Sequence, residues 1–187
     1  LEHRDPFTTL PDINWPLTYE KLGLTAEYAK ASKKLVFPEE NPSLWACPMV
    51  PGATPSRVVA SYRKLKVDVW TYYDDLDANV SKNDRDPNCD GAYMVGFRRT
   101  IEADDEFADL SANQLAKTCH QGIVLVERLV LGFGFFVTTG QHLDVKTATL
   151  CSGSRDSGGC VPRVYWGSDS RGVYVRWDSP DHAYVDL

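Results

Sequence analysis

The sequence predicts an α+β fold with two main helices, small antiparallel sheets and long irregular loops. A threonine followed by a proline opens a helix near residue 54, and an apolar stripe with helical spacing runs through residues 123–136. Three β-rich runs follow residue 147, separated by turns rich in glycine, serine and aspartate. With 187 residues, 43% of them hydrophobic and 25% charged, the chain is long enough to bury a core.

Residues 1–52 are expected to form an N-terminal extension packed on a main domain of residues 53–187. The extension contains seven prolines, so we expect irregular structure with one short helix over residues 25–35. Thr25 is the expected N-cap of that helix.

The main domain begins with a helix in which Thr54 suits the N-cap and Pro55 the first helical position. Its expected apolar face consists of Val58, Val59, Tyr62 and Leu65. Residues 66–73 alternate and are β-rich, so a strand should follow. A long polar loop is expected over residues 74–91 and another short strand over residues 93–97.

The second half of the domain opens with Ser111 and Gln114, whose spacing predicts a capping box. The main helix is expected over residues 123–136 and should end at Gly140. Its apolar stripe is Leu125, Leu129, Phe133 and Phe136. Strands are then expected over residues 147–151, 161–166 and 173–177.

The last two of these strands alternate with period two, which places successive side chains on opposite faces. The expected inward set is Val164, Trp166, Val173, Val175 and Trp177. The expected outward set is Arg163, Tyr165, Tyr174 and Arg176. Tyrosine and arginine together on rigid strands have the composition of a binding surface, although an ordinary β-face with large polar residues fits the same pattern.

Residues 151–187 use a restricted set of amino acids. The segment contains no Lys, Glu, Gln or Met, whereas the preceding part of the chain uses Lys and Glu freely. Its Tyr, Ser, Gly, Arg and Trp are typical of antibody-like contact surfaces. This bias indicates a binding function more strongly than any catalytic motif in the chain.

Several function classes fit the sequence poorly. The net charge of −6 argues against a nucleic-acid binder. The apolar stretch 122–137 is interrupted by Glu127 and Arg128 and is too short for a membrane span. The five cysteines form neither a disulfide framework nor a metal motif, and no cofactor is expected.

The aspartate-rich loop raises the question of calcium. Asp75, Asp77 and Asn79 resemble the start of a calcium loop, but Val80 stands where glycine is needed and Asp86 where glutamate is needed. Another calcium geometry remains open, using some of Asp74, Asp75, Asp77, Asn83, Asp84 and Asp86. The favoured interpretation is a solvated loop whose side chains bond local backbone groups.

The chain from about residue 41 onward resembles the variable proteins of diversity-generating retroelements. The residues that carry the resemblance are Thr139-Gly140-Gln141-His142-Leu143-Asp144, Thr149-Leu150-Cys151-Ser152-Gly153-Ser154-Arg155, Val161-Pro162, Trp166 and Trp177, with residues 98–106 and 125–131. The resemblance implies a C-type lectin fold with a C-terminal variable segment, here residues 151–187.

The resemblance also implies how the restricted set of amino acids would arise. In such systems adenines of a template are mutated, and the resulting codons cannot specify Lys, Glu, Gln, Met or Trp. Trp166 and Trp177 then belong to the fixed scaffold. The implied variable, ligand-binding positions are Asp156, Cys160, Arg163, Tyr165, Gly167, Ser168, Asp169, Tyr174, Arg176, Asp178, Asp181, His182, Tyr184 and Asp186.

The expected function is therefore display of a diversified surface that binds an unknown ligand, a protein or another surface macromolecule, without catalysis. Two alternatives remain. One is an enzyme of the formylglycine-generating oxidase type on the same fold, using Cys151 and Cys160. The other is a calcium-dependent carbohydrate-binding lectin, although the usual sugar-binding triplets are absent from the sequence.

Overall fold

The computed structural model describes residues 10–36, 43–118 and 121–183 and has a mixed α+β architecture. The helices are α1 (Trp15–Lys21), α2 (Thr25–Ser32), α3 (Pro55–Lys64), α4 (Leu76–Asn79), α5 (Pro87–Asp90), α6 (Ala112–Leu115) and α7 (Leu125–Thr139), with 3-10 helices η1 (Asp105–Phe107) and η2 (Ala116–Thr118). The strands are β1 (Leu44–Met49), β2 (Asp68–Thr71), β3 (Val80–Asn83), β4 (Tyr93–Arg98), β5 (Thr149–Leu150), β6 (Ser154–Asp156), β7 (Val161–Gly167) and β8 (Gly172–Asp178).

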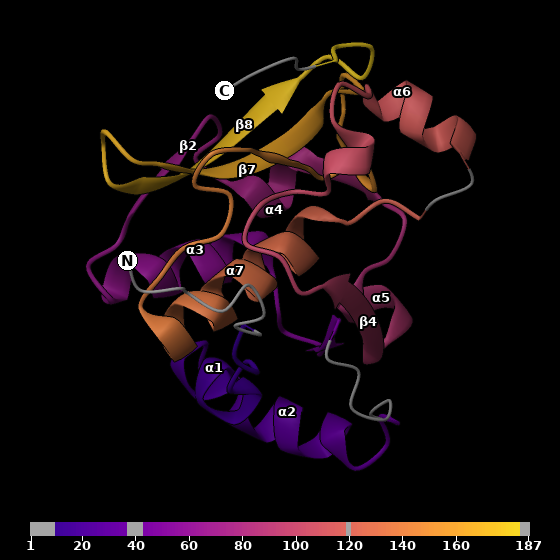
Figure 1. The fold of residues 1–187 in the computed structure, drawn as a ribbon. Helices are drawn as coiled ribbons and strands as arrows, with labels where there is room; N and C mark the ends of the chain where they lie inside the picture. Colours follow the sequence, from indigo (N-terminus) through magenta and orange to yellow (C-terminus); the bar gives the residue numbers. More distant parts are fainter. Residues whose placement is uncertain (1–9, 37–42, 119–120, 184–187) are drawn as a thin grey trace.

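Helices α3 and α7 pack together in the middle of the molecule (Figure 1). The sheet that contains β2, β8 and β7 lies on one side of this helix pair, and α1 and α2 lie on the other. The two main helices expected from the sequence thus form the layer on which the late strands rest.

The strands form three small sheets. β1 pairs with β4, β3 pairs with β6, and the third sheet has the order β2-β8-β7-β5. Its β7 and β8 are antiparallel neighbours, but β2 runs parallel to β8, so the expectation of purely antiparallel sheets is wrong for this pair. Because no short hairpin joins β2 to β8, local turn geometry does not fix their relative direction.

Helix α3 begins as its sequence predicts. The Thr54 side chain accepts a hydrogen bond from the Arg57 backbone N–H at 3.2 Å, and Pro55 is the first helical residue. Leu65 was expected on the apolar face of α3, and this is wrong. It is the C-cap of the helix and is 38% exposed.

Helix α7 begins two residues later than expected, at Leu125, and continues to Thr139. At its start, Ser154 Oγ accepts a hydrogen bond from Leu125 N at 2.8 Å, and a Glu127 carboxylate oxygen accepts one from Val124 N at 3.0 Å. It ends where predicted, at Gly140, whose φ of 72° is the left-handed conformation that glycine adopts without strain.

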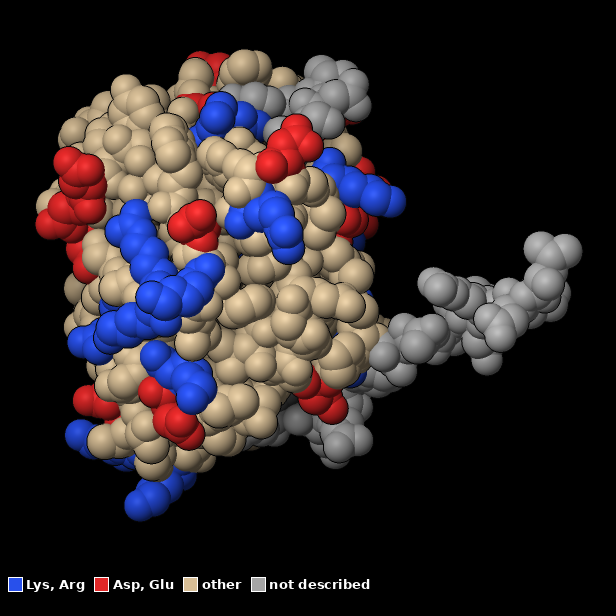
Figure 2. Space-filling view, turned by 90° about the vertical axis from the view of Figure 1, so that its left-hand side faces the viewer, with Lys and Arg blue, Asp and Glu red and all other residues tan. Residues whose placement is uncertain are grey.

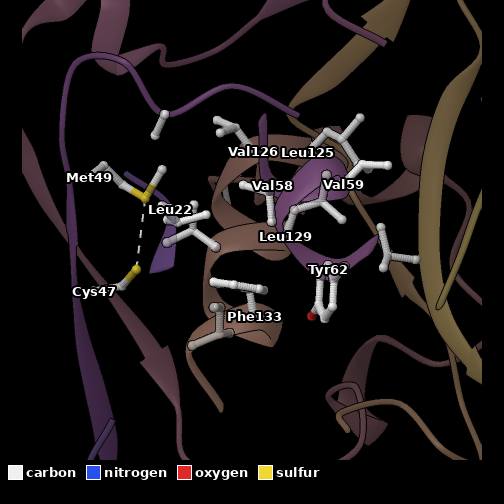
Figure 3. Close-up of a cluster of buried hydrophobic side chains, with 14 of the residues drawn as sticks. Leu22, Cys47, Met49, Val58, Val59, Tyr62, Leu125, Val126, Leu129 and Phe133 are labelled. Atoms are coloured by element: carbon white, nitrogen blue, oxygen red, sulfur yellow. Dashed lines mark hydrogen bonds between the residues drawn. The ribbon is translucent and has the colours of Figure 1, made fainter. Parts of the chain in front are cut away.

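The core lies between α3, α7 and their neighbours. In Figure 3, Val58, Val59 and Tyr62 of α3 face Leu125, Leu129 and Phe133 of α7. Cys47 and Met49 of β1 and Leu22 after α1 complete the cluster, and all ten labelled side chains are buried. The predicted stripe is confirmed for Leu125, Leu129 and Phe133, whereas Phe136 is only partly buried.

Residues 10–36 and 43–52 contain more regular secondary structure than the prolines suggest. Helix α1 was not expected, yet Asn14 caps it by accepting a hydrogen bond from Leu17 N, and Pro16 lies in its first turn. Strand β1 was not expected either. Thr25 is the first residue of α2 and not its N-cap, because Leu24 holds that position without a side-chain hydrogen bond.

The stretch expected to be a polar loop, residues 74–91, contains α4, β3 and α5 instead. Asp75 caps α4 and Asp86 caps α5, each accepting hydrogen bonds from backbone N–H groups of the helix it precedes. These side chains do bond local backbone, as the favoured interpretation of the loop states. The strand at residues 93–97 and the Ser111–Gln114 capping box are confirmed by β4 and α6. Strand β6 was not expected.

Candidate functional site

The candidate site is the face of β7, β8 and β2 that points away from α3 and α7. In the antiparallel pair, Arg163 lies opposite Arg176 and Tyr165 opposite Tyr174. With period two, these four side chains lie on one face, as predicted. Val164, Val173 and Val175 point the other way and are at most 5% exposed, which confirms their expected inward position.

Aromatic rings cross this face from strand to strand. Tyr165 stacks on Tyr174 with ring centroids 5.1 Å apart, and Tyr174 stacks on Trp70 of β2 with centroids 5.8 Å apart. We call Trp70, Tyr174 and Tyr165 the aromatic row. Trp70 is 44% exposed and the two tyrosines are partly exposed, so the row borders solvent.

The two arginines beside the row differ in their surroundings. Arg176 is exposed, with its guanidinium 5.3 Å from the Trp70 ring centroid and 5.7 Å from that of Tyr174. Arg163 is only 8% exposed, so its expected position on the solvent-facing surface is wrong. It forms an ion pair with Asp178 at 2.9 Å, and its guanidinium lies 5.5 Å from the centroid of the Tyr165 ring.

The expected position of Asp156 on the contact surface is also wrong. Its residue is 7% exposed, and its carboxylate accepts hydrogen bonds from the Tyr73 hydroxyl and from the backbone N–H groups of Gly158 and Cys160. It therefore holds the turn after β6 together and does not belong to an exposed contact surface.

The other expected contact positions are spread over the late turns. Ser168 and Asp169 are exposed in the turn between β7 and β8. Gly167 has little freedom to vary, because a Cβ there would lie 2.6 Å from the Tyr174 ring. Among the remaining positions, Cys160 is partly exposed, Asp178 binds Arg163, Asp181 accepts a hydrogen bond from the Asn113 side chain at 2.6 Å, and His182 is exposed. Tyr184 and Asp186 lie outside the described residues.

Trp166 and Trp177, the two tryptophans expected in the scaffold, pack against the core. Trp166 stacks on His142 with centroids 3.6 Å apart, and Trp177 meets Tyr73 edge to face at 5.4 Å. Both are only partly buried, but they pack against the core as the inward set requires.

Sequence reasoning missed Trp70 and the exposed Tyr72. The signal was available, because Val67 and Val69 alternate with Asp68 and Trp70 in the same period-two pattern used for the later strands. What the pattern could not supply is the pairing of β2 with β8, which brings Trp70 beside Tyr174.

A cavity of about 880 Å³ lies between β4, residues 100–110 and β5, and Arg163 of β7 is among the residues that line it. Several charged side chains that line it are paired with one another or with core groups. Arg98 binds Asp104 and Glu106, Arg85 binds Glu127, and Arg128 binds Asp144. These pairs are contacts that hold its walls together, so we do not assign the binding function to this cavity.

The cysteine pair of the enzyme alternative shows no catalytic arrangement. Cys151 and Cys160 are both free thiols, and Cys151 is fully buried. Burial raises the pKa of the Cys151 thiol well above its ordinary value, so the reactive thiolate is disfavoured. Within residues 10–36, 43–118 and 121–183, no group of three or more His, Cys, Asp or Glu side chains is placed to hold a metal ion.

No helix in the described part of the chain has the length and apolarity needed to cross a bilayer. Comparison with protein-family models, with curated proteins and with solved structures found no match to this chain.

Proposed function

We propose that this chain is a ligand-binding display protein. Its ligand-contacting surface is the outer face of β7, β8 and β2, centred on Tyr165, Tyr174 and Arg176. One observation carries the proposal: exposed aromatic and arginine side chains share one face of strands whose opposite face is a nearly fully buried valine layer. Trp, Tyr and Arg are the residues that contribute most energy to protein interfaces.

We further propose that this surface is diversified, on a scaffold of the C-type lectin type, by retroelement mutagenesis. Supporting this are the resemblance of residues 139–177 to variable proteins and the absence of Lys, Glu, Gln and Met after residue 150. The separation of layers also supports it, because side chains that rest on a packed layer can change at little cost in stability. Asp156 and Arg163 are excluded from the freely variable set, since each is buried and bound to groups inside the protein.

Two matched libraries displayed on cells test the proposed surface. The outer library randomises Tyr165, Ser168, Tyr174 and Arg176, and the inner library randomises Val164, Trp166, Val173 and Val175. Most members of the outer library should resist protease and some should bind unrelated target proteins, whereas few members of the inner library should fold. Widespread unfolding in the outer library, or the absence of binders in it, would contradict the proposal.

The retroelement part has its own test in the DNA around the coding sequence. We expect a near-copy of the 3′ end of the gene, differing at adenines, close to a reverse transcriptase gene. Differences spread over all four bases would contradict diversification by this route while leaving the binding surface intact.

A further inference from the structure

The contacts among the rings of the aromatic row limit the kind of ligand that this face can bind. β8 lies between β2 and β7, so the Tyr174 ring has Trp70 against one face and Tyr165 against the other. The ring planes of Trp70 and Tyr174 are 28° apart, and those of Tyr174 and Tyr165 are 10° apart. Both faces of Tyr174 are therefore covered by neighbouring rings. A flat ligand such as a base or a sugar ring needs a free ring face, and the centre of the row offers none.

At the centre of the row, what Tyr174 can present to a ligand is its ring edge, with the guanidinium of Arg176 beside it. The edge of an aromatic ring carries partial positive charge. Arg176 is held near the Trp70 and Tyr174 rings and, among the described residues, has no carboxylate partner, in contrast to Arg163, which binds Asp178. A guanidinium fixed in this way can bind a carboxylate through two parallel N–H donors.

Further cationic side chains lie at the end of the sheet where β2 and β8 begin. Arg63 and Lys64 end α3, Lys66 follows, and all three are exposed. Arg171 is also exposed, and it is brought to the same place because the next residue along, Gly172, pairs with the start of β2. Lys and Arg side chains gather on the side of the molecule where α3, β2 and the β7–β8 turn lie (Figure 2).

This local charge is opposite to that of the chain, which carries −6 overall. Asp68 and Asp169 are also exposed near this end, but the basic side chains outnumber them. Lys64, Lys66 and Arg171 form no ion pair with any carboxylate of the described residues. We call Arg63, Lys64, Lys66, Arg171 and Arg176 the basic margin.

Building on the function proposed above, we propose that the ligand of this face is an acidic protein segment, rich in Asp and Glu. Its carboxylates bind the basic margin, including Arg176, and its apolar atoms contact the ring edges of the aromatic row. Single-stranded nucleic acid would also bring negative charge, but its recognition depends on bases stacking on free aromatic faces. Because the central ring is covered on both faces, the observations favour the protein segment.

Selection from a random dodecapeptide phage library on the immobilised protein tests this. Selected peptides should be enriched in Asp and Glu. Arg176→Gln should weaken their binding about tenfold, the loss of one charge-assisted contact. Salt of about 0.3 M should weaken it further, because screening reduces the attraction of the basic margin. The control Lys30→Gln/Lys33→Gln removes two exposed lysines from the α2 end and should leave the affinity unchanged.

The outcomes separate this inference from the proposed function. Selected peptides that are neutral or basic, need Tyr165 and Tyr174, and are indifferent to Arg176→Gln would overturn the acidic partner and leave the binding face standing. If no selected peptide depends on the two tyrosines, the proposed binding face itself is wrong. Tighter binding of an oligothymidylate than of any selected peptide, abolished in Tyr165→Ala/Tyr174→Ala, would assign the face to nucleic acid instead.

Discussion

Two adjacent charged residues in the core helix, Glu127 and Arg128, are both buried and both paired. Glu127 accepts hydrogen bonds from Arg85, from the Tyr93 hydroxyl at 2.9 Å and from Val124 N. Arg128 binds Asp144 at 2.7 Å. The sequence shows these charges inside an apolar run but not their side-chain partners Arg85, Tyr93 and Asp144, which are at least 16 residues away along the chain.

Removing the partner of Arg128 should strongly destabilise the protein. Asp144→Asn leaves a buried guanidinium without its counter-charge, and we expect a loss of about 3–5 kcal/mol in the free energy of unfolding. Urea denaturation measures this loss. The control Glu20→Gln breaks the exposed Glu20–Lys21 pair and should change stability by less than about 1 kcal/mol. Equal effects of the two substitutions would contradict the structural role of Asp144.

His142 should make the protein sensitive to moderate acid. It lies between Phe136 and Trp166, and burial, with a smaller effect of Arg128, lowers the pKa of its imidazole to about 4. The unfolded chain takes up a proton near about pH 6.5, whereas the folded protein does so only near pH 4. The contribution of neutral His142 is therefore complete above the unfolded pKa and declines as the pH falls from there to about 4.

This loss can be tested by measuring the melting temperatures of the wild type and of His142→Phe between about pH 7 and about pH 4.5. Phenylalanine keeps the stacking between Phe136 and Trp166 but does not titrate. The wild type should lose more stability than the variant over this range. Parallel curves for the two proteins would show that the imidazole is not held neutral by the fold.

At the scale of an element, α7 depends on two glycines that helix propensity alone disfavours. A Cβ at Gly132 would lie 2.4 Å from the Arg128 side chain, and one at Gly134 would lie 2.8 Å from Ile13 and 3.0 Å from Trp15. Gly134 thus lets α1 approach α7 closely. Helix propensity disfavours glycine at these two positions, but the close packing of neighbouring groups leaves no room for a larger residue.

Gly134→Ala should destabilise the protein in spite of the better helix propensity of alanine. Propensity favours alanine by at most about 1 kcal/mol, whereas overpacking against Ile13 and Trp15 costs about 1–3 kcal/mol. We expect a net loss in the free energy of unfolding, measured with urea. In the control Gly96→Ala, the nearest atom to the new Cβ is 3.8 Å away, and stability should be unchanged or higher. A stabilised Gly134→Ala would show that α1 does not pack as described.

At the scale of the whole molecule, the N-terminal segment is part of the core. β1 pairs with β4 from Leu44–Arg98 to Met49–Tyr93, and Tyr19, Trp45 and Met49 are at most 2% exposed. Tyr19 also donates a hydrogen bond to the Pro48 carbonyl oxygen. The proposed binding face, on the opposite side of α3 and α7, rests on a core to which residues 10–36 and 43–52 contribute directly.

A chain of residues 53–187 should therefore fail to unfold cooperatively. Loss of each large buried side chain costs about 2–5 kcal/mol, and the total stability of a domain is only about 5–15 kcal/mol. Thermal unfolding followed by near-ultraviolet circular dichroism measures this. Adding a separate peptide of residues 1–52 should restore part of the transition. A sharp transition of residues 53–187 alone would show that the extension is dispensable.

The sequence by itself determined the local features: the starts of α3 and α6, the end of α7, and which side chains of β7 and β8 share a face. Capping and period-two alternation depend on neighbours in the chain, so they can be read without a fold. Only the tertiary structure decided that Trp70 joins the two tyrosines and that Arg163 is buried instead of exposed. Those outcomes depend on which distant segments pack together, and long-range packing leaves no periodic trace in the sequence.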